Sequence, residues 1–435
     1  METTGDDEGN ELKVKQGEPI LVPPAEETPR VPYFLSNLDQ NVAVIIKTIF
    51  CFKSKDEGNE RAAKVIKDAL AKVLVHYYPL AGRLTISAEG KLMVDCTGEG
   101  VLFVEAEADC NMADVGDIDK PESATLDKLI YNVRGAKNIM EMPLLVVQVT
   151  NFRCGGFVLG RAMNHCMFDG IAAVEFVKSW SEIAQNLPLS VTPFLDRTIL
   201  RSRTPPLVEF PHREFLDITD ISDTATIYKH HPMLYRSFCF DLERLDRLKR
   251  LAIEESFVSK CTSFEALSGF VWQARTRALG LRPKQQTKLL FAIDGRARFN
   301  PPLPRSYFGN GMVLANSLAT AEELTKNSVG FAVKKVQEAN RMVTDSYMRS
   351  AIDYFEMTRS RPSLTGTLLL STWSRLPFHT INFGWEEPVH HGPVTMPEKD
   401  VVLFTSHGKE RNGIMVMMGL PDSAMAIFEQ LVEEI

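Results

Sequence analysis

The feature that most constrains the fold is a pair of apolar segments that leads into a histidine and then into an amphipathic segment. Residues 144–152 and 157–163 are β-branched and apolar and flank a Cys-Gly-Gly turn, which predicts two adjacent strands. Apolar residues then recur at helical spacing over 171–185, which predicts a helix with one buried face. This order of elements indicates an α/β fold.

The junction between the second strand and the helix contains His165, with Asp169 four residues later. Catalytic groups are often displayed at such junctions, and an imidazole with an ordinary pKa of about 6.5 can accept a proton at neutral pH. Asp169 directly precedes the helix, which predicts an N-cap. Of the nine histidines only His165 has an aspartate at this offset, but a buried core histidine would fit the spacing alone.

Length and composition narrow the class of protein. A chain of 435 residues fits two domains, and 44% hydrophobic with 24% charged residues is typical of a globular protein. A net charge of -7 argues against nucleic acid or an anionic membrane as the main partner. No run approaches the roughly 18 apolar residues of a membrane span. Seven cysteines without CxxC pairs indicate reduced thiols and no metal site. We expect a monomer in the cytoplasm.

The remaining elements extend the α/β pattern over two domains. Residues 1–10 are acidic and predict a disordered tail, and the Pro-rich stretch 188–232 predicts a crossover linker between domains at 11–187 and 233–435. The first domain should also contain a helix over 61–78 and a hairpin formed by 84–86 and 91–95. For the second domain the patterns predict helices over 263–279, 334–344 and 423–434, and strands over 289–293 and 368–373.

Several ordered motifs carry a family resemblance over nearly the whole chain. They are Tyr77-Tyr78-Pro79-Leu80-Ala81-Gly82-Arg83-Leu84, His165 to Gly170, Thr262-Ser263-Phe264-Glu265 to Trp272, Asp294 to Arg298, Tyr307-Phe308-Gly309-Asn310 and Asn382-Phe383-Gly384-Trp385. With these motifs the chain resembles the plant BAHD acyltransferases, which transfer an acyl group from coenzyme A. The resemblance implies two similar-sized domains like those of chloramphenicol acetyltransferase, with mixed β-sheets flanked by helices. It also implies an active-site channel at their interface, and we expect it to be open from both sides.

Within that family, the segments 36–41, 48–53 and 358–364 resemble a clade that moves hydroxycinnamoyl groups, feruloyl in particular, onto ω-hydroxy fatty acids and fatty alcohols. Acyl-coenzyme A would be a co-substrate, and no permanently bound cofactor is expected. Two alternatives stay open. One is a shikimate or quinate acceptor, for which Arg359 and Arg361 are the available cations, and the other is a non-catalytic relative of the elongase-associated kind.

The resemblance also implies roles for individual residues. His165 would be the general base, and Asp169 would be mainly structural and point away from the substrate. Coenzyme A is expected to contact Thr262, Ser263, Phe264 and Lys284, whereas Ser371, Trp373 and Phe378 would contact the substrate. Lys284 belongs to a basic cluster that is also compatible with a solvated helix end; the other members are Arg275, Arg277, Arg282 and Lys288.

The chain departs from the family pattern at Asn382 and Glu386, where the family usually has Asp and Gly around Phe-Gly-Trp. The structural loop that contains Asn382, Gly384 and Trp385 is expected to hydrogen-bond Arg296 or Arg298. Because Asn lacks the charge of Asp, either the site is hydrated or another acid compensates, with Glu386 and Glu387 as the candidates. A left-handed turn at Glu386 would be strained, because a residue with a side chain disfavours positive φ.

Overall fold

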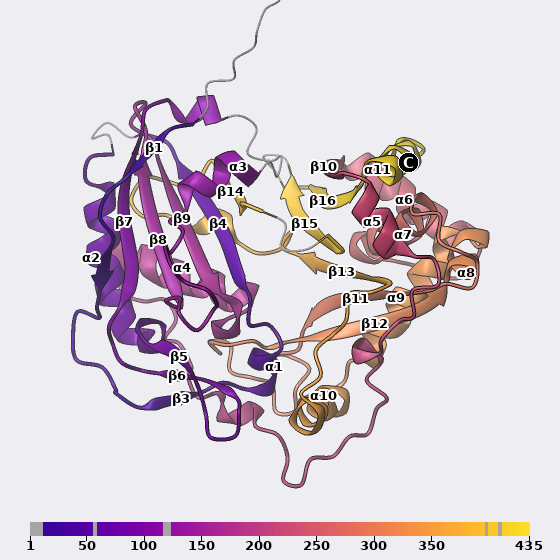
Figure 1. The fold of residues 1–435 in the computed structure, drawn as a ribbon, viewed down its shortest axis with the longest axis horizontal. Coiled ribbons are helices and arrows are strands. Elements are labelled where there is room, and N and C mark those ends of the chain that lie inside the picture. Colours follow the sequence, from indigo (N-terminus) through magenta and orange to yellow (C-terminus); the bar gives the residue numbers. More distant parts are fainter. Residues whose placement is uncertain (1–11, 55–58, 116–122, 396–398, 408–410) are drawn as a thin grey trace, which may run out of the picture.

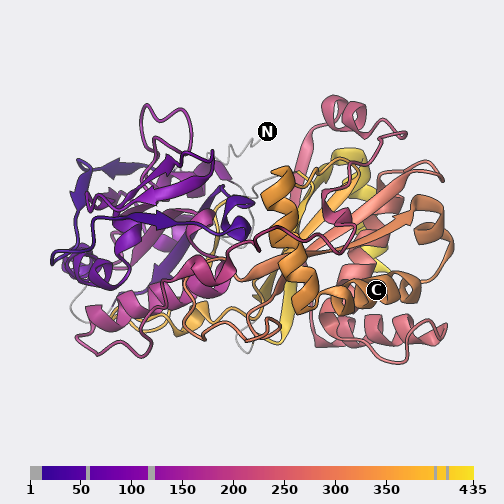
Figure 2. The ribbon, with the colours of Figure 1, turned by 90° about the horizontal axis from the view of Figure 1, so that it is seen from below.

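The computed structural model describes residues 12–54, 59–115, 123–395, 399–407 and 411–435. The predicted tail over 1–10 therefore lies outside the described residues. The chain folds into two halves that lie side by side, each built on a mixed β-sheet with helices packed against it (Figure 1 and Figure 2). This arrangement confirms the predicted fold class.

The first sheet has the strand order β1-β7-β8-β9-β4-β14, and β2 also pairs with β7. β7 and β8 are parallel, whereas β8, β9, β4 and β14 pair antiparallel. β9 is buried along its whole length because both faces of the sheet are covered, which explains its lack of polar alternation. The strands are β1 (Val14–Gln16), β2 (Ile20–Val22), β4 (Ile45–Phe52), β7 (Val101–Ala108), β8 (Leu145–Asn151), β9 (Phe157–Asn164) and β14 (His390–Pro393).

Two helices pack against one face of this sheet, α2 (Ala62–His76) and α4 (Gly170–Ala184). The Trp180 indole Nε1 donates to the Ile66 carbonyl at 2.9 Å, which joins the two helices inside the core. Both helices and the β8–β9 strand pair confirm the sequence predictions. Short helices complete this half: α1 (Asn37–Gln40), η1 (Tyr78–Ala81), η2 (Met112–Val115), α3 (Ser123–Leu126), η3 (Asp127–Leu129) and η4 (His165–Met167).

A small antiparallel sheet of order β3-β6-β5 lies at the end of the first half. Its strands are β3 (Pro32–Phe34), β5 (Arg83–Ile86) and β6 (Leu92–Asp95). The β5–β6 pair confirms the predicted hairpin.

The second sheet has the order β10-β16-β15-β13-β11-β12, in which β11, β13 and β15 are parallel. Its strands are β10 (Met233–Phe240), β11 (Gln286–Asp294), β12 (Met312–Thr320), β13 (Thr367–Thr372), β15 (Val401–His407) and β16 (Gly413–Pro421). The helices of this half are α6 (Leu242–Glu254), α7 (Ser263–Ala278), α8 (Ala321–Lys326), α9 (Val329–Met342), α10 (Asp345–Thr358) and α11 (Asp422–Glu433). They include the three predicted helices, and β11 and β13 confirm the two predicted strands.

Helix α7 runs antiparallel to the three parallel strands. Phe264, in its first turn, contacts Phe291 of β11 and Phe404 of β15, whereas Trp272 further along donates to Thr287 at the start of β11 at 3.2 Å. The N-terminus of α7 therefore lies toward the carboxyl ends of these strands, the position at which open α/β sheets commonly bind ligands.

One segment of the predicted second domain lies in the first half. After β13 the chain crosses over, and β14 pairs with β4 as the edge strand of the first sheet (Figure 1). Phe378, from η7 (Phe378–Thr380), and Phe383 are buried in the core of the first half. The boundary drawn at 233–435 is therefore wrong for this segment, because pairing between distant strands leaves no local signal in the sequence.

The crossover over 188–232 contains η5 (Arg197–Leu200), η6 (Arg213–Phe215) and α5 (Thr224–His230). His212 lies between two partners: its Nδ1 is 2.7 Å from Glu214 Oε1, and its Nε2 is 2.8 Å from Ser350 Oγ. This serine–histidine–carboxylate array is sealed, because Ser350 is 0% exposed and His212 is 2% exposed. It fastens the crossover to α10 and presents no nucleophile. Among the described residues, no helix has the length and apolar character needed to cross a membrane.

Candidate active site

His165 begins the short turn η4, which joins the end of β9 to the start of α4. The Asn164 side chain caps this turn by accepting from the Cys166 N–H at 3.2 Å. The His165 N–H donates to the Val44 carbonyl at 2.8 Å, which anchors the turn to the segment before β4. The main chain thus fixes the histidine at a strand-to-helix junction, as the sequence predicts.

All three carbonyl groups of this turn accept side-chain hydrogen bonds from outside it. Asn310 Nδ2 donates to the His165 carbonyl at 2.9 Å. Arg197 Nη1 donates to the Cys166 carbonyl at 3.1 Å, and Nη2 donates to the Met167 carbonyl. Because Arg197 comes from the crossover and Asn310 from the second half, both regions position the histidine turn.

The charge of Arg197 is balanced by Asp39 of α1, whose carboxylate lies 3.3 Å away, and both side chains are 0% exposed. Asp39 also accepts from the Asn310 main-chain N–H at 3.0 Å and from Nδ2 at 2.9 Å. Burial opposes the charged form of Arg197, but Asp39 outweighs it and raises the arginine pKa. No sequence pattern indicates a role for Arg197, because it lies in the irregular crossover without a motif around it.

Asp169 is the N-cap of α4 and accepts from the Ala172 N–H at 3.1 Å, which confirms the predicted cap. Arg296 binds the same carboxylate with both terminal nitrogens, at 2.7 and 2.9 Å, and the Gly311 N–H donates to it at 2.9 Å. Burial alone would raise the Asp169 pKa, but Arg296 and these N–H donors outweigh burial and lower it. The carboxylate is fully engaged in joining the two halves.

The imidazole of His165 has different surroundings. Its Nδ1 is buried and has no hydrogen-bond partner among the described residues, whereas the residue as a whole is partly exposed. Burial lowers the pKa of His165 below its ordinary value of 6.5, although the charge of Asp169 opposes this shift. The ring is therefore neutral at neutral pH and can act as a proton acceptor.

The expected contact between Asn382 and Arg296 or Arg298 is wrong. The Asn382 side chain accepts from the Gly384 N–H at 2.7 Å, and its carbonyl accepts from Gln185. Arg296 binds Asp169 instead, and Arg298 donates to the Asn340 and Val343 carbonyls at 2.8 and 3.1 Å. The compensating acid proposed at Glu386 or Glu387 is thus unnecessary, since Asp169 already supplies the charge.

The loop that contains Asn382 is held by its aromatic residues. Phe383 packs against Phe52 and Trp180, and Trp385 packs edge-on against Phe157. Gly384 has a φ of 106°, and Glu386 has a φ of 67° in the left-handed region, which is the strained turn expected from the sequence.

The residues expected to contact coenzyme A do not form one group. Thr262 is the N-cap of α7, and its side chain forms a capping box with Glu265. Lys284 is exposed and follows the opposite end of this 16-residue helix, which is about 24 Å long at 1.5 Å per residue. Lys284 therefore lies too far from Thr262, Ser263 and Phe264 to share one phosphate site with them.

Two members of the basic cluster, Arg275 and Lys288, are buried and do not belong to a solvated helix end. Arg275 is 4% exposed and pairs with Asp400 at 2.5 Å. Lys288 is buried and donates to the Glu214 and Leu216 carbonyls at 3.0 and 2.7 Å, and burial lowers its pKa to about 8. These two side chains are structural and are not available to a phosphate.

The three predicted substrate residues follow one another along β13 and the crossing segment. Ser371 and Trp373 are partly exposed, whereas Phe378 is 4% exposed. The Phe378 ring contacts Trp373, Phe50 and His391, with ring centroids 6.0, 5.8 and 5.1 Å apart. This aromatic group extends from the domain junction into the core of the first half.

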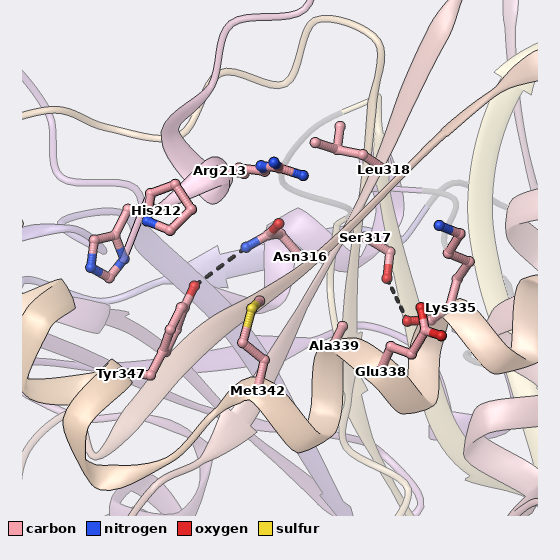
Figure 3. A pocket seen from close by; sticks show the side chains of 11 residues that line it. His212, Arg213, Asn316, Ser317, Leu318, Lys335, Glu338, Ala339, Met342 and Tyr347 are labelled. Carbon is pink, nitrogen blue, oxygen red and sulfur yellow. Dashed lines mark hydrogen bonds between the residues drawn. The ribbon is translucent and has the colours of Figure 1, made fainter. Parts of the chain in front are cut away.

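A cavity of about 360 Å³ lies elsewhere, between β12, α9 and the crossover (Figure 3). Arg213, Asn316, Lys335 and Tyr347 are among the side chains that line it. Asn316 is five residues along β12 from Gly311, or about 16 Å at roughly 3.3 Å per residue. None of the predicted site residues lines this cavity, so it is separate from the His165 turn.

The Asp169–Arg296 pair leads to a prediction about stability. Asp169→Asn should lower the free energy of unfolding by about 1.5–3 kcal/mol, because a charge-assisted bond to a buried arginine is lost. Asp294→Asn is the matched control, since Asp294 binds the same arginine at 3.1 Å but its side chain is 45% exposed. Its cost should stay below about 1 kcal/mol. Denaturant unfolding of both variants checks this, and equal losses would contradict the assignment.

Comparisons with known proteins agree with this geometry. A family model described as the Transferase family matches residues 12–435. The chain is 61% identical over 422 residues to the omega-hydroxypalmitate O-feruloyl transferase of Arabidopsis thaliana, covering 96% of this chain and 92% of that protein. It is 56% identical over 427 residues to the fatty alcohol:caffeoyl-CoA acyltransferase of the same plant, covering 97% and 99%.

Solved structures show the same fold at low sequence identity. Vinorine synthase superposes with a TM-score of 0.76 at 22% identity, covering 95% of this chain and 96% of that one. The F. sporotrichioides TRI101 complex with coenzyme A and T-2 gives a TM-score of 0.71 at 17% identity, covering 92% and 97%. The chain belongs to the Transferase family of BAHD acyltransferases and is an acyl-CoA-dependent O-acyltransferase.

Proposed function

We propose that this enzyme moves a hydroxycinnamoyl group, with feruloyl as the preferred one, from coenzyme A to the hydroxyl of a long-chain ω-hydroxy fatty acid or fatty alcohol. The observation that carries this proposal is the neutral imidazole of His165, a partly exposed residue on a turn that hydrogen bonds from the crossover and the second half hold in place. Two relatives that share more than half of their residues with this chain are named for feruloyl and caffeoyl transfer to such acceptors.

The reaction follows from the position of the histidine. His165 Nε2 takes the proton of the acceptor hydroxyl as its oxygen attacks the thioester carbon, and an O–C bond forms. The carbon–sulfur bond of the resulting tetrahedral adduct then breaks. The sulfur leaves as the coenzyme A thiol after it regains the proton from the imidazolium. Asp169 takes no part in proton transfer, because Arg296, Ala172 and Gly311 occupy its carboxylate.

The phosphates of the acyl-coenzyme A co-substrate are assigned to the N-terminus of α7, at Thr262 and Ser263. The free N–H groups and positive end of a helix favour an anion there. This terminus faces the carboxyl ends of β11, β13 and β15, near Ser371 and Trp373, which we assign to the substrate channel. No permanently bound cofactor is required by this chemistry.

Variants that introduce a negative charge distinguish a phosphate site at Thr262 and Ser263 from a phosphate site at Lys284. Ser263→Glu should raise the KM for acyl-coenzyme A by about fivefold to tenfold through repulsion, and it should preserve the helix because a first-turn acid stabilises it. Lys284→Glu, at the opposite end of α7, is the control and should leave this KM unchanged. Initial rates measured against acyl-coenzyme A concentration check both. A rise with Lys284→Glu alone would move the phosphate site to that end.

A substrate panel tests the proposed function. Purified protein is incubated with feruloyl-, caffeoyl-, cinnamoyl- and acetyl-coenzyme A, each with a long-chain ω-hydroxy acid, a fatty alcohol or shikimate, and free thiol and ester are both followed. Hydroxycinnamoyl donors with the aliphatic acceptors should give the highest kcat/KM. A preference for shikimate would favour the alternative that uses Arg359 and Arg361. Absence of turnover with every pair would favour the non-catalytic alternative.

We further infer that the protein acts as a monomer in the cytoplasm. Size-exclusion chromatography with light scattering tests the first inference, and imaging of a tagged protein in plant cells tests the second.

A further inference from the structure

One buried cation, Arg161, takes no part in the proton transfer at His165. Arg161 of β9 is 0% exposed, and its Nε donates to Thr48 Oγ1 at 2.8 Å. Its guanidinium lies 4.8 Å from the Phe50 ring centroid and 6.0 Å from that of Phe378. Nη1 is buried and has no hydrogen-bond partner among the described residues. A buried arginine left in this state is costly, because neither water nor an anion replaces its lost solvation.

The surroundings of Arg161 contain no described carboxylate that would balance its charge. Among the described residues no charge offsets the effect of burial, which lowers the pKa of Arg161 to about 9, so the side chain is still protonated at neutral pH. The other buried arginines near the domain junction differ in this respect, since Arg197 pairs with Asp39 and Arg296 with Asp169. An oxygen acceptor from outside the chain would complete the hydrogen bonding of Arg161.

The position of Arg161 relative to His165 limits what that acceptor can be. Arg161 lies in β9 and precedes His165, the first residue of η4, by four residues, which separates their Cα atoms by at most about 13 Å at roughly 3.3 Å per residue. When the side chains of Arg161 and His165 both extend from the main chain toward a ligand between them, the distance that remains between their nitrogen atoms suits the length of a planar arylpropenoyl group. A long-chain ω-hydroxy acid with its hydroxyl at His165 would place its carboxylate well beyond Arg161.

Side chains between the two residues indicate the route for such a group. Ile46 pairs with Met163 on the same face of the sheet as Thr48 and Arg161. Ile46 and Trp373 are partly exposed, whereas Met163 and Phe378 are buried. Because Met163 lies between Arg161 and His165 on this face, an aromatic ring that entered beside His165 would reach Arg161 only after a change of rotamer at the flexible Met163 or at Phe378.

We propose that Arg161 determines donor specificity by hydrogen-bonding a ring oxygen of the acyl group, with the ring placed among Phe50, Phe378 and Trp373. The ligand class is a hydroxycinnamoyl thioester that carries a phenolic hydroxyl or methoxy oxygen. This inference rests on the proposed function and adds the residue that distinguishes feruloyl and caffeoyl donors from unsubstituted cinnamoyl.

The test compares Arg161→Met with the parent on feruloyl-coenzyme A and cinnamoyl-coenzyme A, with a fatty alcohol as acceptor. The kcat/KM ratio of feruloyl to cinnamoyl should fall by about tenfold to a hundredfold, because only feruloyl has ring oxygens to accept the bond. Lys47→Met is the matched control, since Lys47 lies on the opposite face of β4 and pairs with Asp127 at 3.3 Å. It should leave the ratio unchanged.

Two further measurements distinguish a role of Arg161 in donor specificity from a structural role and from binding of the acceptor. The melting temperature of Arg161→Met should equal or exceed that of the parent, because methionine removes an unpaired buried charge. A marked decrease would instead give Arg161 a structural role and overturn the proposal. Repeating the assay with an ω-hydroxy acid tests the other source of an acceptor oxygen, and a loss confined to that acceptor would also overturn it.

Failure of this inference is distinguishable from failure of the proposed function. If the parent turns over neither feruloyl- nor caffeoyl-coenzyme A, the proposed function fails and the proposal about Arg161 fails with it. If the parent uses both feruloyl- and cinnamoyl-coenzyme A and Arg161→Met slows them equally, only the role of Arg161 is excluded.

Discussion

Replacing His165 with alanine should lower kcat/KM for acyl transfer by about a hundredfold to ten-thousandfold, the usual range for loss of a general base. The melting temperature should stay close to that of the parent. The residue is partly exposed, and its Nδ1 has no hydrogen-bond partner among the described residues. The turn is held through its main-chain carbonyls by Asn310 and Arg197, so truncation breaks none of those contacts. Steady-state kinetics and thermal unfolding measure the two effects separately.

His76→Ala is the matched control for this variant. His76 is exposed in the last turn of α2 and takes no part in the site, so its replacement should change neither rate nor melting temperature appreciably. If His165→Ala kept more than half of the parent activity, another group would have to be the base.

Arg197→Met should cause the largest loss of stability, about 3–5 kcal/mol in the free energy of unfolding. The substitution leaves the Asp39 carboxylate buried without its cation. It also removes the donors to the carbonyls of Cys166, Met167 and Phe308. Because two of these carbonyls belong to the histidine turn, kcat should fall as well.

The exposed Arg201, four residues along the crossover, supplies the control. It stacks on Phe34 at 4.4 Å, so Arg201→Met should cost no more than about 1 kcal/mol. Adding Asp39→Asn to Arg197→Met should recover part of the lost stability, because the stranded charge is removed. Similar unfolding midpoints for the Arg197 and Arg201 variants would show that the buried pair is not what holds the turn.

Elements whose pattern is local in the sequence could be predicted from it. Helical spacing over 61–78 and 171–185 predicted α2 and α4, and the apolar runs on either side of the Cys-Gly-Gly turn predicted β8 and β9. Asp169 could be identified as an N-cap because its capping partner, Ala172, is only three residues away. The motif that contains His165 then placed the base at the junction of these elements.

Long-range partners could not be predicted in the same way. Asp169 and Arg296 are 127 residues apart, and any of several acids could have paired with that arginine. The family pattern favoured Asn382 as the partner of Arg296 or Arg298. The position of the Asn382 loop is instead determined by the packing of its hydrophobic residues Phe383 and Trp385. Lys284 was expected beside Thr262 because the phosphates of coenzyme A need a cation, but the two residues lie beyond opposite ends of α7, which separates them by the length of that helix.

The central claim is that a neutral His165 removes the proton of the acceptor alcohol. The most direct test is the pH dependence of kcat/KM for the alcohol at saturating acyl-coenzyme A, measured from about pH 5 to about pH 8. Because burial lowers the pKa of His165, the base form is already complete near neutral pH. The rate should therefore fall only on the acid side, with one apparent pKa below 6.5, and His165→Ala should lack this acid limb. An apparent pKa above the ordinary histidine value, or the same acid limb in His165→Ala, would contradict the account.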